Sequence, residues 1–196
     1  MKNLLIKKMS ICAVLFALIF VLSWTVLGMI PLGVVSATTI FLPVVLGIII
    51  IDDWKYSLFL GFGFGLASWL RALLAPSGVL DPYFANPIVS ILPRILMGIS
   101  CHYLYQVYKK IPLKTVGYGL LGGTAAFVNT LFTMTFLCTI YNKEITELLI
   151  RFEYSWAGWL FGSICLLNMI PEIVLGIIVS VSLGKVFDVI TTRISR

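Results

Sequence analysis

Six long apolar runs, separated by short polar segments, restrict this chain to a fold inside a membrane. Of its 196 residues, 60% are hydrophobic and 11% are charged, whereas a soluble domain carries about 25% charged residues. A helix needs about 20 apolar residues to cross the hydrocarbon core. We therefore predict an all-α integral membrane protein with one transmembrane domain over residues 1–196. Its six spanning helices are expected at residues 9–30, 38–51, 56–74, 87–108, 116–141 and 159–186.

The basic residues predict how these helices are oriented. Ten lysines and arginines lie on the side that holds both termini and three lie on the other side, which with Arg94 accounts for all 14. Because cytoplasmic loops carry an excess of Lys and Arg, both termini are expected to be cytoplasmic, in a multi-pass protein of the cell membrane. The loops at 31–37, 75–86 and 142–158 would then face outward and could act as lids.

The basic residues do not indicate a nucleic-acid partner. The net charge is +6, but Lys and Arg concentrate in the short segments between apolar runs, where anionic lipid headgroups are a sufficient partner. The first apolar run is longer than the core of a signal peptide and lacks a clear cleavage site. We therefore expect it to be retained as the first helix.

Arg94 stands several residues inside the fourth apolar run, within the segment Asn86–Gly98. Placing a charged side chain at the bilayer centre costs about 3 kcal/mol on insertion scales, and more in simulations. Such a residue normally faces a protein interior or a wet cavity. Two roles fit the sequence: Arg94 binds an anionic ligand, or it forms a buried ion pair with an acidic residue on another helix.

Other polar residues are expected at a similar depth in the outer half of the membrane. With a rise of 1.5 Å per residue, Arg94 lies roughly 10 Å from the outer end of its helix, Asn168 roughly 13 Å and Asn129 roughly 18 Å. Glu172 follows Asn168 by one turn on the same helix face, and Ser90 precedes Arg94 by one turn. These residues predict that three helices contribute polar groups to one pocket.

The pocket is expected to bind a small molecule with one anionic group and several hydroxyl or amide groups. Arginine binds carboxylates through a bidentate fork, and asparagine offers both a donor and an acceptor. Phe41 and Trp69 would supply apolar walls. Structural alternatives remain open: hydrogen bonds between helices for the asparagines, neutralisation of Arg94 by Glu172, and plain packing for both aromatic residues.

The sequence contains no visible arrangement for catalysis. The single histidine, His102, has no metal-binding or catalytic companions, and no nucleophile–base pair, zinc motif or complete nucleotide-binding loop is present. We therefore expect neither an enzyme nor a bound cofactor or metal. A membrane carrier or a binding subunit fits the sequence better.

Several strings in the chain resemble one known family. Ala13-x-x-x-Ala17 forms a face of small residues near the cytoplasmic end of the first helix. The other matching strings are Ala37–Gly47, Asn86–Gly98, Gly122–Thr130 and Ile170-Pro171-Glu172. With six helices in under 200 residues, the whole chain resembles the substrate-binding (S) components of energy-coupling factor (ECF) vitamin transporters. Within this family it is most similar to the pantothenate-specific type.

The resemblance implies a mechanism of transport. An S component captures its vitamin outside with high affinity and delivers it by reorienting on a transmembrane coupling protein, driven by two separate cytoplasmic ATPases. Arg94 would hold the carboxylate of the vitamin, Asn129 its hydroxyl or amide groups, and Ala13 and Ala17 would contact the coupling protein. An S component for another vitamin such as folate, or a stand-alone carrier, remains an alternative.

Overall fold

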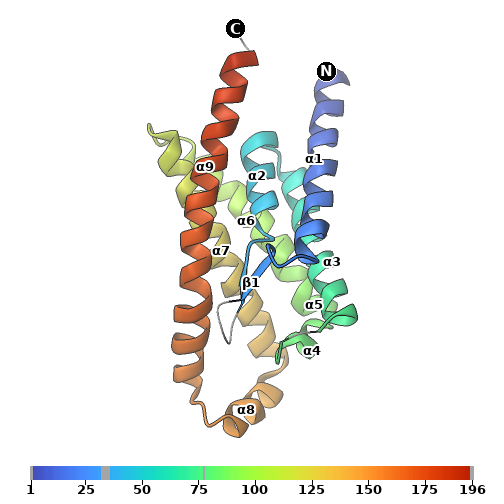
Figure 1. Cartoon of the computed structure of the whole chain (residues 1–196), viewed down its shortest axis with the longest axis vertical. Coiled ribbons are helices and arrows are strands. Elements are labelled where there is room, and N and C mark those ends of the chain that lie inside the picture. The colour runs from blue at the N-terminus through green and yellow to red at the C-terminus, as the bar shows by residue number, and fades with distance from the viewer. Residues whose placement is uncertain (1, 32–35, 77, 195–196) are drawn as a thin grey trace.

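The computed structural model describes residues 2–31, 36–76 and 78–194, and its helices run along one long axis (Figure 1). The elements in chain order are α1 (Lys2–Ser23), β1 (Met29–Pro31), β2 (Ser36–Thr38), α2 (Leu42–Ile51), α3 (Trp54–Leu74), α4 (Asp81–Phe84), α5 (Pro87–Ser90), α6 (Leu92–Tyr108), α7 (Lys114–Ile140), α8 (Asn142–Arg151), the π-helix η1 (Gly158–Met169) and α9 (Ile170–Ile194). Both ends of the chain lie at one end of the molecule, which we call the termini end, and α8 lies at the other, the α8 end.

Five of the six predicted spanning helices are present. Within the described residues, five helical stretches are long and apolar enough to cross a membrane: Leu4–Ser23, Trp54–Leu74, Pro87–Tyr108, Lys114–Ile140 and Gly158–Val189. The chain is therefore a multi-pass membrane protein. The second predicted span is the exception, because α2 has only 10 residues and rises roughly 15 Å, about half of the hydrocarbon thickness.

A two-stranded hairpin replaces the missing half of this second span. The first helix was expected to continue to Ile30, but α1 ends at Ser23, and β1 then pairs antiparallel with β2, with Met29 opposite Thr38. The molecule is helical apart from these two three-residue strands, so the predicted all-α class holds for the bundle. The predicted end of the first helix at Ile30 is wrong, because an apolar run alone does not distinguish a helix from a short buried strand. Residues 32–35 of the predicted lid loop at 31–37 lie outside the described residues.

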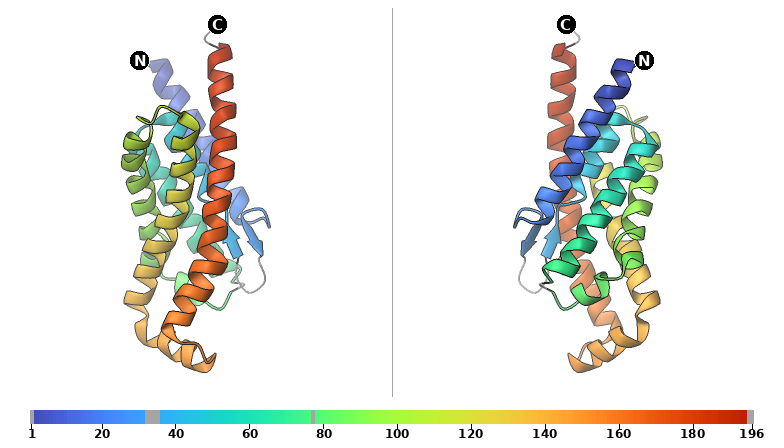
Figure 2. Two further views of the ribbon diagram at one scale, coloured as in Figure 1. Left: turned by 90° about the vertical axis from the view of Figure 1, so that its left-hand side faces the viewer. Right: turned by 90° about the vertical axis from the view of Figure 1, so that its right-hand side faces the viewer.

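The other two predicted loops contain short helices. The loop at 75–86 includes α4, and the loop at 142–158 includes α8, whose Ile145 and Leu149 are buried in a small apolar cluster with Leu137. Figure 2 shows α8 closing the end opposite the termini, with the hairpin on one flank of the bundle. These segments build the end of the molecule in which the candidate site lies.

Close packing between α3 and α6 depends on glycine. A Cβ atom at Gly61 would lie 2.5 Å from the carbonyl oxygen of Arg94, and one at Gly65 would lie 2.6 Å from the Cα atom of Ile91. Any larger residue would push the two helices apart, because these neighbours are backbone atoms. The glycines of α3 therefore set the position of the backbone that carries Arg94.

A polar network fixes the corner between α2 and α3 at the termini end. Asp52 has a left-handed backbone conformation with φ of 48°, which aspartate tolerates better than most residues. Lys109 Nζ and Gln106 Nε2 each donate to its carboxylate at 2.7 Å. Partial burial opposes ionisation of Asp52, but these hydrogen bonds outweigh it and lower the pKa of the carboxyl group below its ordinary value.

Candidate ligand-binding site

Arg94 lies next to an interruption in the fourth predicted helix. The helix breaks at Ile91, between α5 and α6, because Pro93 has no N–H to donate to the carbonyl of Val89. Arg94 Nη1 donates to this same carbonyl oxygen at 2.9 Å. The guanidinium thus takes the place of the missing backbone donor, and this hydrogen bond fixes its position.

The guanidinium of Arg94 lies against two aromatic rings and forms no ion pair in the part of the chain that the structure describes. Its Cζ atom lies 5.6 Å from the ring centroid of Phe64 and 5.5 Å from that of Phe84, and the residue is 8% exposed. Among the described residues, Arg94 takes part in no ion pair within the 4.0 Å limit. The alternative of a buried ion pair between Arg94 and Glu172 is therefore not what this structure shows.

Glu172 instead binds the hairpin. Its Oε1 accepts a hydrogen bond from the backbone N–H of Thr38 at 2.7 Å, and its Oε2 accepts one from the hydroxyl of Thr130 at 3.2 Å. Non-helical backbone inside a membrane protein must find partners within the protein. Glu172, 2% exposed, supplies one of them and thereby ties β2 to α7 and α9.

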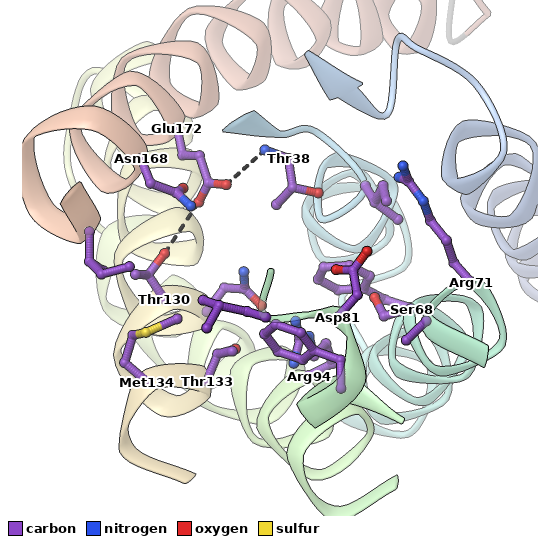
Figure 3. Close-up of a pocket in the computed structure, with 17 residues that line it drawn as sticks. Thr38, Ser68, Arg71, Asp81, Arg94, Thr130, Thr133, Met134, Asn168 and Glu172 are labelled. Atoms are coloured by element: carbon purple, nitrogen blue, oxygen red, sulfur yellow. Dashed lines mark hydrogen bonds between the residues drawn. The ribbon is translucent and has the colours of Figure 1, made fainter. Parts of the chain in front are cut away.

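A cavity of about 170 Å³ lies between the two groups (Figure 3). Its lining includes residues of α4, the start of α6 and the second half of α7, which place it in the half of the molecule nearer α8. It brings together four of the seven predicted ligand-binding residues, namely Arg94, Asn129, Asn168 and Glu172. Its other polar lining residues are Thr38, Ser68, Arg71, Asp81, Thr130 and Thr133, and its apolar ones are Ile40, Phe64, Ala72, Leu80, Phe84, Met134 and Ile164. The cavity therefore combines apolar walls with a larger number of polar and charged side chains, some of which could orient a small molecule.

Several polar atoms in this cavity have no hydrogen-bond partner. Among the described residues, five buried side-chain atoms lack a partner, and four of them belong to residues that line the cavity: Arg94 Nε, Asn129 Oδ1, Thr133 Oγ1 and Asn168 Oδ1. Buried polar groups are normally paired, and each orphan costs about 1–3 kcal/mol. The chamber therefore concentrates four buried hydrogen-bonding atoms that have no partner within the described protein.

The structure places the other three predicted residues outside the lining of the cavity. Phe41 is 1% exposed and packs close to Gly176 of α9 in the apolar core. Trp69 Nε1 donates to the carbonyl of Ala85 at 2.9 Å, and the hydroxyl of Ser90 donates to the carbonyl of Phe84. Trp69 and Ser90 therefore support the segment that carries Phe84, which is itself a wall of the cavity.

Sequence reasoning missed the aromatic walls and the threonines. Phe64 and Phe84 carry no signal that distinguishes them from the other aromatic residues of the chain. Thr133 follows Asn129 by four residues, so helical spacing alone could have placed its hydroxyl on the same face. Within the described residues, no group of three or more His, Cys, Asp or Glu side chains lies close enough to hold a metal ion.

Ala13 and Ala17 lie far from the cavity, on α1. Both are exposed on the surface of the bundle, where the side chains of a spanning helix face lipid or another protein. Ala13 lines a shallow groove together with Cys12, Tyr56 and Phe59. The structure thus leaves this face accessible to a partner, and its predicted role in docking stays a prediction.

Comparison with known proteins decides the family. A model of the family described as "ECF transporter, substrate-specific component" matches residues 7–184. The chain is an S component of this family. It is 30% identical to a protein named "Pantothenate transporter PanT" from Leuconostoc mesenteroides subsp. mesenteroides, over 85% of this chain and 84% of that protein. It is 24% identical to "Pantothenic acid transporter PanT" from Lactococcus lactis subsp. cremoris, over 76% of each chain. The S component is accordingly a transporter subunit rather than an enzyme.

Proposed function

We propose that this S component captures pantothenate from outside the cell membrane. The observation that carries the proposal is Arg94, a buried guanidinium that lies against two aromatic rings and forms no ion pair among the described residues. A buried charge without a counter-ion is strongly unfavourable, and a ligand carboxylate would relieve this cost. The two relatives named as pantothenate transporters support the choice of vitamin.

The hydrogen-bonding groups of the cavity match those of pantothenate. Pantothenate has one carboxylate, two hydroxyls and one amide. Its carboxylate would bind Arg94. Its N–H group and one of its two O–H groups would donate to oxygens of Asn129, Thr133 and Asn168 that lack partners, which leaves the other O–H group for a further acceptor. Its apolar carbons would contact Phe64 and Phe84.

Delivery of the vitamin would require further subunits. The sequence carries no complete nucleotide-binding motif, so the energy would come from two cytoplasmic ATPases and a transmembrane coupling protein that docks on the exposed face of Ala13 and Ala17. In this proposal the termini end faces the cytoplasm and the α8 end faces outward, consistent with the excess of basic residues beside the termini. The cavity, in the half nearer α8, would then open to the outside before docking.

Isothermal titration calorimetry on the purified protein tests the choice of ligand. Pantothenate is expected to bind at one site with a Kd of about 1 μM or tighter, and other water-soluble vitamins, folate included, to bind at least about 100-fold more weakly. Binding of a different vitamin with no heat from pantothenate would overturn the assignment of substrate. Binding of none of them would overturn the proposed role in vitamin capture.

A further inference from the structure

The cavity carries opposite charges on two of its walls. Arg94 lies on one wall, between Phe64 and Phe84, whereas Glu172 and Asn168 project from the η1–α9 segment on another (Figure 3). Each charge is buried, and no ion pair joins them among the described contacts. A ligand that spans the cavity would therefore meet a cation at one end and a carboxylate at the other.

The contacts of Glu172 favour its ionised form. It accepts hydrogen bonds from two donors, the N–H of Thr38 and the hydroxyl of Thr130, and each donor points its hydrogen at a different carboxylate oxygen. A carboxylate offers about four lone-pair sites, so about two remain for a ligand. Glu172 is thus well suited to accept hydrogen bonds from a hydroxyl group and poorly suited to lie beside an anion.

Within the described part of the chain, no basic side chain lies within ion-pair distance of Glu172. Arg71 also lines the cavity, but Figure 3 shows it on the side of the cavity away from Glu172. The Glu172 wall therefore has no cation of its own with which to receive a second anionic group. In a chamber of low dielectric constant, like charges repel strongly.

We propose that Glu172 is a specificity-determining residue that limits this site to ligands with a single anionic group. The inference rests on the proposed function, because the carboxylate of pantothenate must bind Arg94 for its hydroxyl end to reach the Glu172 wall. A hydroxyl there donates to Glu172, whereas a carboxylate or phosphate at the same end is repelled. The site thus rejects unsuitable ligands by an unfavourable contact in addition to binding the right one by favourable contacts.

Two pantothenate derivatives of nearly equal size allow the effect of charge on binding to be measured apart from the effect of size. In one, the primary hydroxyl carbon is oxidised to a carboxylate; in the other, it is converted to the corresponding primary amide. The parent protein is expected to bind the amide at least about tenfold more tightly than the acid. In Glu172→Gln the two affinities should differ by less than about threefold. In Asn168→Asp, which adds an acid on the same wall, the preference for the amide should increase. Glu147→Gln, an exposed change on α8, is the matched control and should leave the ratio unchanged.

The outcomes distinguish this inference from the proposed function. Pantothenate is titrated first, and its failure to bind the parent would overturn both. If pantothenate binds but the parent binds the acid and the amide equally, the specificity inference alone is wrong, and this comparison needs no variant to fold. An unchanged ratio of amide to acid affinity in Glu172→Gln would also overturn the inference, because the acid would then not be excluded by Glu172. Tight binding of the acid by the parent that is lost in Arg71→Ala would overturn it as well.

Discussion

Arg94 and Pro93 act together at the scale of single residues. The missing N–H of Pro93 leaves the carbonyl of Val89 without its helical donor, and Arg94 Nη1 binds that carbonyl, while Nε remains without a partner. One part of the guanidinium is therefore used to fix its position and another is left for a ligand. Phe64 and Phe84 keep the group in place when no ligand is bound.

Replacing Arg94 by alanine is expected to weaken pantothenate binding by at least about 30-fold, because removing one partner of a buried charge pair costs about 2–5 kcal/mol. Calorimetry on the purified variant measures this loss. Arg151→Ala, an exposed change on α8, removes the same charge outside the cavity and should bind like the parent. Parent-like affinity in Arg94→Ala would rule out the assigned role of the guanidinium.

Thr133→Val is expected to move stability and affinity in opposite directions. Its hydroxyl is buried without a partner, so valine should stabilise the ligand-free protein by about 1 kcal/mol while weakening pantothenate binding roughly fivefold. Thermal unfolding in detergent and calorimetry measure the two effects. Thr135→Val, an exposed change on the same helix, is the control. Loss of stability with unchanged affinity would show that the hydroxyl is structural.

At the scale of elements, two interruptions of helical backbone adjoin the site, in addition to the π-helix η1 that carries Asn168. The break between α5 and α6 frees the carbonyl that fixes Arg94, and the hairpin of β1 and β2 brings Thr38 to Glu172. Backbone of this kind is tolerated in a membrane protein only where it is buried or lines a cavity. Both departures adjoin the chamber, as this rule requires.

Pro93→Ala tests the link between the helix break and the site. The N–H of alanine would donate to the carbonyl of Val89 in place of Arg94 and thereby release the guanidinium. Pantothenate affinity is therefore expected to fall about tenfold without loss of thermal stability. Pro87→Ala is a matched control, because proline in the first turn of α5 replaces an N–H that has no helical partner anyway. Equal affinities in the two variants would argue against the coupling.

The sequence predicted those site residues that stand out chemically from an apolar run. Arg94, Asn129, Asn168 and Glu172 are polar residues inside predicted spans, and the structure brings them around one cavity. The walls could not be predicted in this way, because Phe41 is as apolar as Phe64. Which aromatic residue faces the chamber depends on helix rotation and on the hairpin, and both are set by tertiary packing.

On the scale of the whole molecule, the six segments place both termini at one end and the cavity in the other half. Among the described residues five helical stretches are long and apolar enough to span a membrane, and α2, which follows the hairpin, is too short to do so as a helix. The exposed small residues of α1 lie on the surface of this bundle, separate from the cavity. Binding and docking are therefore expected to be separable by mutation.

Replacing both Ala13 and Ala17 by leucine is expected to abolish pantothenate uptake by cells and to leave binding to the purified protein unchanged. Bulky side chains would prevent close approach of a partner helix at this face. Radiolabelled uptake and co-purification of the coupling protein measure docking. The double change Val174→Leu and Val186→Leu enlarges exposed positions on another helix, α9, and serves as the control. Full uptake in the variant with leucine at positions 13 and 17 would favour a stand-alone carrier.

The most direct test of the central claim compares pantothenate with pantothenol, the alcohol that has a CH₂OH group in place of the carboxylate. Both ligands are titrated into the purified parent protein by calorimetry. If the buried Arg94 recognises the carboxylate, pantothenate should bind and pantothenol should bind at least about 30-fold more weakly. Equal affinity for the two ligands, or no binding of pantothenate, would contradict the proposed function.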